Sequence, residues 1–293
     1  MNAPESKFVT VNRLKLHYLE WNECEEPAMI LLHGIGDNGY IWEHFARMSA
    51  DYFRIIAPDQ RGHGRSEWAI PPAYCCDDYV SDISALIDTL KLNRLILMGH
   101  SMGALHATRY ASLHPEKIAA LIHVDIEPCP PAWNKKYLAN LYESLPDTYE
   151  SVEEYIEQAR INSPFADRET LLAVALRSLD RGVDGKFRRQ YDREVLRCFD
   201  AYDLRPDLRN IRCPSLIVRG RQSRVMSREK AREMSLEIPN GRLAEIPEAA
   251  HPVHTDNPRG FGRAVLDFLS GISLIARRTS GDEFQKNQDL SRR

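Results

Sequence analysis

The sequence predicts an α/β fold in which a mostly parallel β-sheet is covered by helices on both faces. Short apolar runs that end at Gly, Pro or Asp alternate with stretches of helical periodicity, the pattern of consecutive strand–helix units. The runs are apolar throughout, as expected for strands buried on both faces. Residues capable of chemistry follow the ends of these runs, where open parallel sheets place their functional sites.

Size and charge exclude several classes of protein. A chain of 293 residues that is 43% hydrophobic is long enough for one large domain or a domain with an insertion. Its 39 Lys and Arg against 42 Asp and Glu give a formal net charge of −3, without the basic field that binds nucleic acid or an anionic membrane. No apolar run reaches the roughly 18 residues of a membrane span, and residues 1–7 are too polar for a signal peptide. We therefore expect a cytoplasmic protein whose partner is a small-molecule substrate, with a homodimer left open.

The N-terminal half is expected to begin with a hairpin and to continue with buried strands and amphipathic helices. Apolar residues alternate with polar ones on both sides of Asn12-Arg13, which indicates two antiparallel strands joined by a tight turn. Buried strands are expected over 28–32, 53–57, 95–98 and 119–124. Amphipathic helices are expected over 80–90 and 102–113.

The C-terminal half departs from this alternation of strands and helices. Residues 128–210 show helical periods only, over 149–161, 170–179 and 187–199, and are rich in Tyr and Phe. We interpret this segment as a helical cap inserted into a core made of residues 1–127 and 211–276. Strands over 215–218 and 241–246 and a helix over 262–269 complete the core. The polar residues 277–293 are expected to form a disordered tail.

The segment GHSMG, residues 99–103, is a G-x-S-x-G motif between a predicted strand and a predicted helix. A serine in this context occupies a sharp, strained turn, and the flanking glycines let neighbouring backbone pack close. The turn presents the hydroxyl of Ser101 at the positive end of the following helix. Ser101 is therefore the candidate nucleophile.

His33-Gly34, directly after a buried strand, is the second candidate element of an active site. An enzyme with a serine nucleophile needs two backbone N–H donors for the oxyanion that develops during the reaction. We expect these donors to come from Ile35, after His33-Gly34, and from Met102, after the nucleophile. The alternative is that His33-Gly34 is only a turn.

The segment DQRGHGRS, residues 59–66, also follows a buried strand, but here we favour a structural role. Its glycines permit a tight loop. We expect Asp59 and Arg61 to bind backbone groups or each other rather than substrate.

A general base is also required, and His251 is the favoured residue because it lies after the last predicted strand and before the last helix. His254 is the competitor. The pair His251-x-x-His254 suggests a metal site, but no third ligand lies nearby in the sequence, so we expect no metal.

These motifs, HG at 33–34, DxRGxGxS at 59–66, GHSMGA at 99–104 and the late histidine, resemble those of the α/β-hydrolase superfamily over residues 8–270. The resemblance implies a Ser–His–acid triad, an eight-stranded sheet and a cap between the sixth and seventh strands. The motifs are similar to those of the epoxide hydrolase and dehalogenase branch, whose members carry Asp at the nucleophile position. Ser101 instead favours esterases, lactonases and C–C bond hydrolases.

The acid of the implied triad departs from the commonest pattern of the superfamily. That acid follows the seventh strand in a pattern like G-x-x-D, whereas this chain has Ser223 at the corresponding position. Asp125, at the end of the predicted strand 119–124, occupies the position that a minority of the superfamily uses. Glu127 and Glu248 are weaker candidates, and Asp125 in the alternative interpretation only caps its turn.

The resulting hypothesis is a serine hydrolase that cleaves a carboxylic ester or lactone, with Ser101 as nucleophile, His251 as base and Asp125 as the acid that orients it. Two alternatives remain: a C–C bond or amide hydrolase acting on a small carboxylic acid, and a ligand receptor with little turnover. No metal or organic cofactor is expected. Cap aromatics such as Trp133 and Tyr137 are candidates to line an apolar pocket, and most are as readily explained by packing. Cap arginines are candidates to bind a substrate carboxylate or to be solvated: Arg160, Arg177, Arg188 and Arg189.

Overall fold

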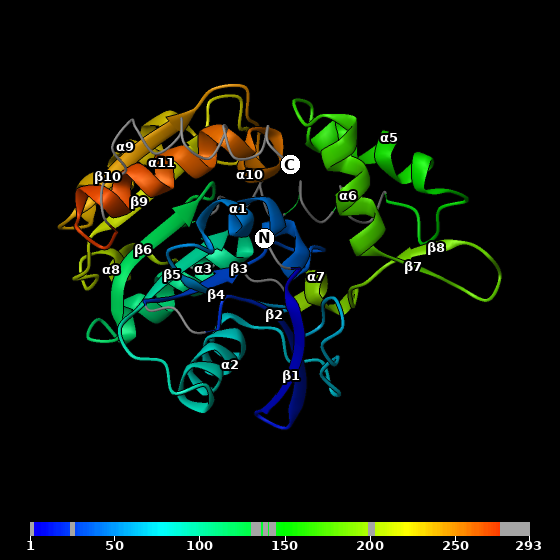
Figure 1. Cartoon of the computed structure of the whole chain (residues 1–293), viewed down its shortest axis with the longest axis horizontal. Helices are drawn as coiled ribbons and strands as arrows, with labels where there is room; N and C mark the ends of the chain where they lie inside the picture. The colour runs from blue at the N-terminus through cyan, green and yellow to red at the C-terminus, as the bar shows by residue number, and fades with distance from the viewer. Residues whose placement is uncertain are drawn as a thin grey trace, which may run out of the picture.

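A computed structural model of the chain describes residues 3–23, 27–129, 136, 140, 145–198 and 203–275. Within these residues the main sheet has eight strands in the order β1-β2-β4-β3-β5-β6-β9-β10 (Figure 1). The N-terminal strands β1, β2 and β4 pair antiparallel, and all other neighbours pair parallel. The strands are β1 (Glu5–Val11), β2 (Leu14–Trp21), β3 (Ala28–Leu32), β4 (Arg54–Pro58), β5 (Leu95–His100), β6 (Ile118–Val124), β9 (Ser215–Gly220) and β10 (Gly241–Ile246).

Helices cover both faces of this sheet, which confirms the predicted fold class. Alternate residues of a central strand face opposite sides: Ile30 of β3 packs in the cluster beneath one helical layer, and Met29 and Leu31 pack beneath the other. One layer contains α2 (Cys76–Thr89), α3 (Met102–Leu113) and α9 (Arg228–Glu237), and the other contains α1 (Glu43–Ser49) and α11 (Pro258–Gly271). A 3-10 turn, η1 (Gly39–Trp42), precedes α1, and α10 (Val253–Asp256) precedes α11.

The predicted hairpin turn is also present. Asn12 and Arg13 have φ angles of 48° and 66°, so both lie in the left-handed region. Two consecutive residues of this kind match the right-handed twist of the strands that they join. The turn is tied to α2, because the side-chain amide of Asn12 donates to the Asp82 carboxylate at 2.9 Å.

The segment between β6 and β9 carries smaller elements: those within residues 152–189 lie together beside the main sheet, in green to yellow-green in Figure 1, whereas the short helix at 205–208 lies apart from them and contacts α3. We refer to its described part as the cap. Its elements are α5 (Val152–Asn162), α6 (Arg168–Ser178), β7 (Leu179–Arg181), β8 (Phe187–Arg189), α7 (Glu194–Cys198) and α8 (Arg205–Leu208). Trp133, Tyr137 and residues 277–293 lie outside the described residues.

The expectation of helical structure alone in this segment is wrong. Residues 187–199 do not form one helix, because Phe187–Arg189 pairs antiparallel with Leu179–Arg181. Gly185, with a φ of 81°, allows the chain to reverse between the two strands. Phe187 also exchanges two backbone hydrogen bonds of 2.8 Å with Tyr149. Helical structure in the described part of this stretch is confined to Glu194–Cys198.

The segment DQRGHGRS is held by buried polar contacts. Asp59 accepts hydrogen bonds from the backbone N–H groups of Gly39 and Arg65, at 2.7 and 2.8 Å. Arg61 does not pair with Asp59; its guanidinium makes a bidentate contact with the Asp82 carboxylate of α2, at 2.6 and 2.7 Å. The segment therefore connects the sheet to α2, in agreement with a structural role.

Replacing Asp82 with Ala should lower the free energy of unfolding by about 3–5 kcal/mol, because the buried Arg61 cation loses its bidentate partner and keeps the more distant Asp78 carboxylate, at 3.6 Å. Guanidinium chloride unfolding measures this effect. Asp88→Ala in the same helix is the matched control, since the Asp88–Lys117 pair is exposed and contributes about 0–1 kcal/mol. Equal losses in the two variants would contradict a structural role for the Arg61–Asp82 pair.

Candidate active site

Ser101 occupies a strained turn between β5 and α3. Its φ and ψ are 52° and −122°, and its backbone N–H donates to the carbonyl of Val124 at 2.9 Å. The turn requires glycine on both sides. A β-carbon on Gly99 would lie 2.1 Å from the carbonyl oxygen of Gly103, and one on Gly103 would lie 2.5 Å from that of Leu32. The close packing of strand, turn and helix thus fixes the position of Ser101 above the sheet.

Asp125 begins the turn after the neighbouring strand β6, and its side chain is fully buried. Its Oδ2 accepts a hydrogen bond of 2.8 Å from Nδ1 of His251, and its Oδ1 accepts one of 3.0 Å from the backbone N–H of Gly220. Because Nδ1 carries the proton in this contact, Nε2 of the neutral imidazole keeps its lone pair. The structure therefore brings the predicted acid and the predicted base together.

Ser223 contributes to the same contact, which the sequence interpretation missed. Its hydroxyl donates to Asp125 Oδ2 at 2.5 Å and accepts from the backbone N–H groups of Val225 and Met226. In the commonest pattern of the superfamily, the loop after β9 carries the acid of the triad. In this chain the same loop instead supplies a hydroxyl donor to Asp125, the acid that follows the neighbouring strand β6. Ser223 stands where the commonest pattern has its acid, and this position is the sequence feature that could have revealed the contact.

The other candidate acids lie elsewhere. The Glu127 carboxylate accepts a hydrogen bond of 3.4 Å from the backbone N–H of Ser227 at the start of α9. Glu248 lines a groove outside the cavity that contains Ser101 and His251. Neither carboxylate is hydrogen-bonded to His251 among the contacts of the described residues.

His254, the competitor of His251, is buried against the core. Its ring stacks on Trp42 with a centroid separation of 4.4 Å. Burial, reinforced by the neighbouring His251, lowers the pKa of His254 to about 3. Neither of its ring nitrogens hydrogen-bonds to a described residue. His251, in contrast, faces the same cavity as Ser101 and keeps 23% of its side chain exposed.

The loop after β3 brings Ile35 into this cavity. Gln60 holds the loop, because its backbone N–H donates to Nε2 of His33 and its side-chain amide donates to the His33 carbonyl. A β-carbon on Gly34 would lie 3.3 Å from that of Ser101, so the loop packs directly against the serine. Met102, the other predicted oxyanion donor, is the first residue of α3.

Residues of the core and of the cap line a partly open cavity of about 490 Å³. Ser101, His251 and Ile35 line it from the core, and the cap contributes apolar groups: Tyr155, Ala159, Ile161, Phe165, Leu171 and Val174. Among the described residues that line it, the charged side chains besides histidine are Asp37, Arg189 and Arg224. Of the four cap arginines singled out from the sequence, Arg189 is the one found in this lining.

Asp37 is a second residue that the sequence interpretation missed. Burial in the cavity raises the pKa of its carboxyl to about 7, although the charges of Arg189 and His251 act in the opposite direction. His100, whose ring lies beside Gly34 as the Asp37 carboxyl does, remains neutral, because burial and the nearby His251 and His254 lower its pKa well below the usual range. The cavity thus contains a carboxyl group that titrates near neutral pH.

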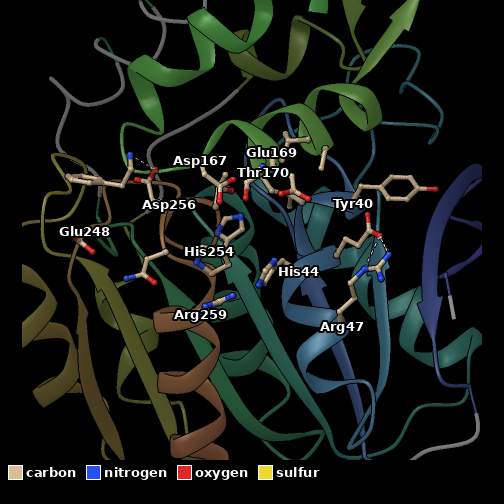
Figure 2. Close-up of a pocket in the computed structure, with 18 residues that line it drawn as sticks. Tyr40, His44, Arg47, Asp167, Glu169, Thr170, Glu248, His254, Asp256 and Arg259 are labelled. Atoms are coloured by element: carbon tan, nitrogen blue, oxygen red, sulfur yellow. Dashed lines mark hydrogen bonds and ion pairs between the residues drawn. The ribbon is translucent and has the colours of Figure 1, made fainter. Parts of the chain in front are cut away.

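Asp256 joins the cap to the loop that carries His251. One carboxylate oxygen accepts from the backbone N–H groups of Phe165 and Ala166, both at 3.2 Å, and the other accepts from Ala250 at 2.7 Å. Figure 2 shows Asp256 in a groove of about 870 Å³, where core residues such as His254 face Asp167 and other cap residues. Phe165 and Ala250 also line the cavity of Ser101, so Asp256 lies behind its wall.

Two further observations concern the described part of the chain. None of its helices has the length and apolar composition needed to cross a membrane. No group of three or more His, Cys, Asp or Glu side chains within it is arranged to hold a metal ion.

Comparison with known proteins identifies the family. The model of the alpha/beta hydrolase fold family matches residues 27–258. The chain is 30% identical over 271 residues to 2-(acetamidomethylene)succinate hydrolase from Mesorhizobium japonicum, covering 90% of this chain and 95% of that protein. It is 25% identical over 293 residues to epoxide hydrolase 1 from Caenorhabditis elegans, covering 91% and 70%. A crystal structure of E-2-(acetamidomethylene)succinate hydrolase matches with a TM-score of 0.83 at 27% identity, over 91% of this chain and 99% of that chain.

The chain belongs to the α/β-hydrolase fold family, as the resemblance of its motifs predicted. Within that family it is a hydrolase.

Replacing Asp256 with Asn should lower the free energy of unfolding by about 1–3 kcal/mol, since an amide NH2 would face a backbone N–H donor at a buried position. Urea unfolding measures the loss. The control is Asp167→Asn, in the same groove, because Asp167 caps α6 through Thr170 and Asn caps equally well. A change of less than about 0.5 kcal/mol in Asp256→Asn would show that the contact contributes little.

Proposed function

We propose that the protein is a serine hydrolase that cleaves a carboxylic ester or lactone through an acyl-enzyme intermediate. The observation that carries this proposal is the 2.8 Å hydrogen bond from His251 to the buried Asp125, with His251 and Ser101 lining one cavity. Nucleophile, base and orienting acid come from the carboxyl ends of three parallel strands, where such sheets place their active sites.

In the proposed reaction, Ser101 Oγ attacks the acyl carbon and transfers its proton to Nε2 of His251. Asp125 holds the histidine in the required tautomer and stabilises the imidazolium that forms. The backbone N–H groups of Ile35 and Met102 donate to the oxyanion. His251 then protonates the leaving oxygen, and afterwards activates the water that releases the acid and regenerates Ser101.

An amide or C–C bond hydrolase acting on a small carboxylic acid is the second candidate. It is supported by the relative from Mesorhizobium japonicum, whose name specifies a substrate with an acetamido group and a succinate skeleton. Amide cleavage would use the same residues, with His251 protonating nitrogen in place of oxygen. A panel of short esters, lactones, amides and vinylogous acids separates the two candidates, and no turnover of any of them would favour a ligand receptor.

Ser101→Ala should abolish turnover and leave the melting temperature nearly unchanged, because the hydroxyl is the proposed nucleophile. A serine-directed organophosphate should add once to the wild type, and peptide mass spectrometry should find it on Ser101. Ser163→Ala is the control, since Ser163 also lines the cavity and its loss should not prevent labelling. An adduct on any other residue would exclude Ser101 as the nucleophile.

Asp125→Asn should keep the fold and lower kcat by about 10⁴, the loss caused by the analogous change in the serine protease triad. Ser223→Ala should lower kcat by about tenfold, because Asp125 loses one hydrogen-bond donor but keeps His251. Steady-state kinetics on the best ester measures both effects. Glu127→Gln is the control, and a larger loss there than in Asp125→Asn would contradict the assignment of the acid.

The double variant Asp125→Asn, Ser223→Asp should recover part of the activity lost in Asp125→Asn. A carboxylate at position 223 would lie close to the place that Asp125 Oδ2 occupies, since the two side chains are 2.5 Å apart. The recovery should be partial, because Val225 and Met226 fix the Ser223 loop around a hydroxyl. No recovery in a folded double variant would show that His251 cannot be reached from this loop.

A further inference from the structure

Arg189, at the end of β8, contributes a positive charge to the cap side of the cavity. Its Nε donates to the hydroxyl of Tyr149 at 3.1 Å, and its guanidinium carbon lies 5.0 Å from the centre of the Tyr155 ring. Both tyrosines are buried, and their rings pack edge to face with a centroid separation of 5.3 Å. The aromatic pair therefore holds the guanidinium in a defined orientation at the cavity wall.

The charges around the cavity favour an anion. Arg189 and Arg224 are cationic, and the carboxyl of Asp37 is the acidic group among the described lining residues. Burial keeps part of the Asp37 population protonated at neutral pH, since its pKa is raised to about 7. Among the described lining residues the positive charges therefore outnumber the negative one, in a cavity partly shielded from solvent, where charge interactions are stronger than in water.

We infer that Arg189 binds a carboxylate of the substrate, and that the enzyme prefers acyl compounds with a second, ionised carboxyl group, such as half-esters of dicarboxylic acids. The inference rests on the proposed function, because it places the scissile acyl group at Ser101. The planar guanidinium of arginine presents paired donors that match the two oxygens of a carboxylate. The same cavity is lined by apolar cap residues such as Ile161 and Phe165, which suit the carbon chain that joins the two ends of such a compound.

Asp37 makes this recognition depend on pH. A bound carboxylate near Arg189 raises the tendency of Asp37 to keep its proton, since two negative charges in one cavity repel each other. By linkage, the half-ester binds more weakly once Asp37 ionises above about pH 7. The other titratable groups near Asp37 are His251, the hydroxyl of Tyr155 and the ring of His100. Burial keeps His100 neutral, and His251 affects charged and uncharged substrates through the same chemical step.

The test compares monomethyl esters of succinate, glutarate and adipate with matched methyl esters in which a methyl ketone replaces the free carboxyl group. The wild type should prefer at least one half-ester in kcat/KM. Arg189→Gln should lower kcat/KM for that half-ester by about 10- to 100-fold, the value of a charge-assisted hydrogen bond, and should change the neutral ester by less than threefold. Arg189→Lys keeps the charge but loses the paired donors of the guanidinium, so its kcat/KM for the half-ester should lie between those of the wild type and Arg189→Gln.

Arg188→Gln is the matched control, because Arg188 is adjacent in sequence but pairs with Asp184 on the exposed hairpin. It should leave the preference unchanged. The neutral ester also reports whether each variant is folded and active. Equal losses of Arg189→Gln on charged and neutral esters, or a wild-type preference for the neutral esters, would overturn the inference.

A pH series examines Asp37 separately. The wild-type preference for the half-ester should decline above about pH 7 through KM, and Asp37→Asn should abolish this decline. Identical pH profiles for the two proteins would exclude the role of Asp37.

Calorimetric binding of glutarate separates this inference from the proposed function. It should be weaker in Arg189→Gln, Ser101→Ala than in Ser101→Ala alone, whatever the chemistry at Ser101. Unchanged turnover in Ser101→Ala with weaker glutarate binding on loss of Arg189 would refute the proposed function and keep the carboxylate site.

Discussion

The buried carboxylate of Asp125 is the contact on which the arrangement of the site depends. It accepts hydrogen bonds from the Gly220 backbone, the Ser223 hydroxyl and the His251 ring, which lie after or at the ends of β9 and β10. A buried carboxylate without such partners would be strongly unfavourable, so these donors together stabilise it there. One side chain therefore fixes the relative positions of three strand ends and of the proposed base.

A second set of buried polar contacts supports the other half of the cavity. Gln60 binds both the ring and the carbonyl of His33, and its side-chain oxygen accepts from the His106 ring of α3. Burial lowers the pKa of His33, so this histidine stays neutral and can accept at Nε2. The segment DQRGHGRS thus positions the loop of Ile35, and its charged residues do not line the cavity.

Much of this arrangement follows from local sequence. The strand–turn–helix context of GHSMG predicts the strained turn at Ser101, and the serine at position 223 directs attention to Asp125. Local sequence does not show which distant segments come into contact. Asp256 meets Phe165 because the cap docks on the core, and the chemical character of Asp37 arises from its surroundings in the cavity. The short strands β7 and β8 escape prediction because three residues are too few to display a period.

The two oxygens of the Asp256 carboxylate connect the cap to the loop of His251 through hydrogen bonds, from behind the wall of the substrate cavity. The cap at Phe165 and the residue before His251 share one acceptor, so neither can be displaced without disturbing the other or breaking a hydrogen bond. Engineering the cap for a new substrate thus carries a mechanical constraint. Substitutions in the cap that shift residues 165 and 166 will also shift the loop of His251. Variants that keep the contacts of Asp256 intact therefore allow substrate selectivity to be changed without moving His251.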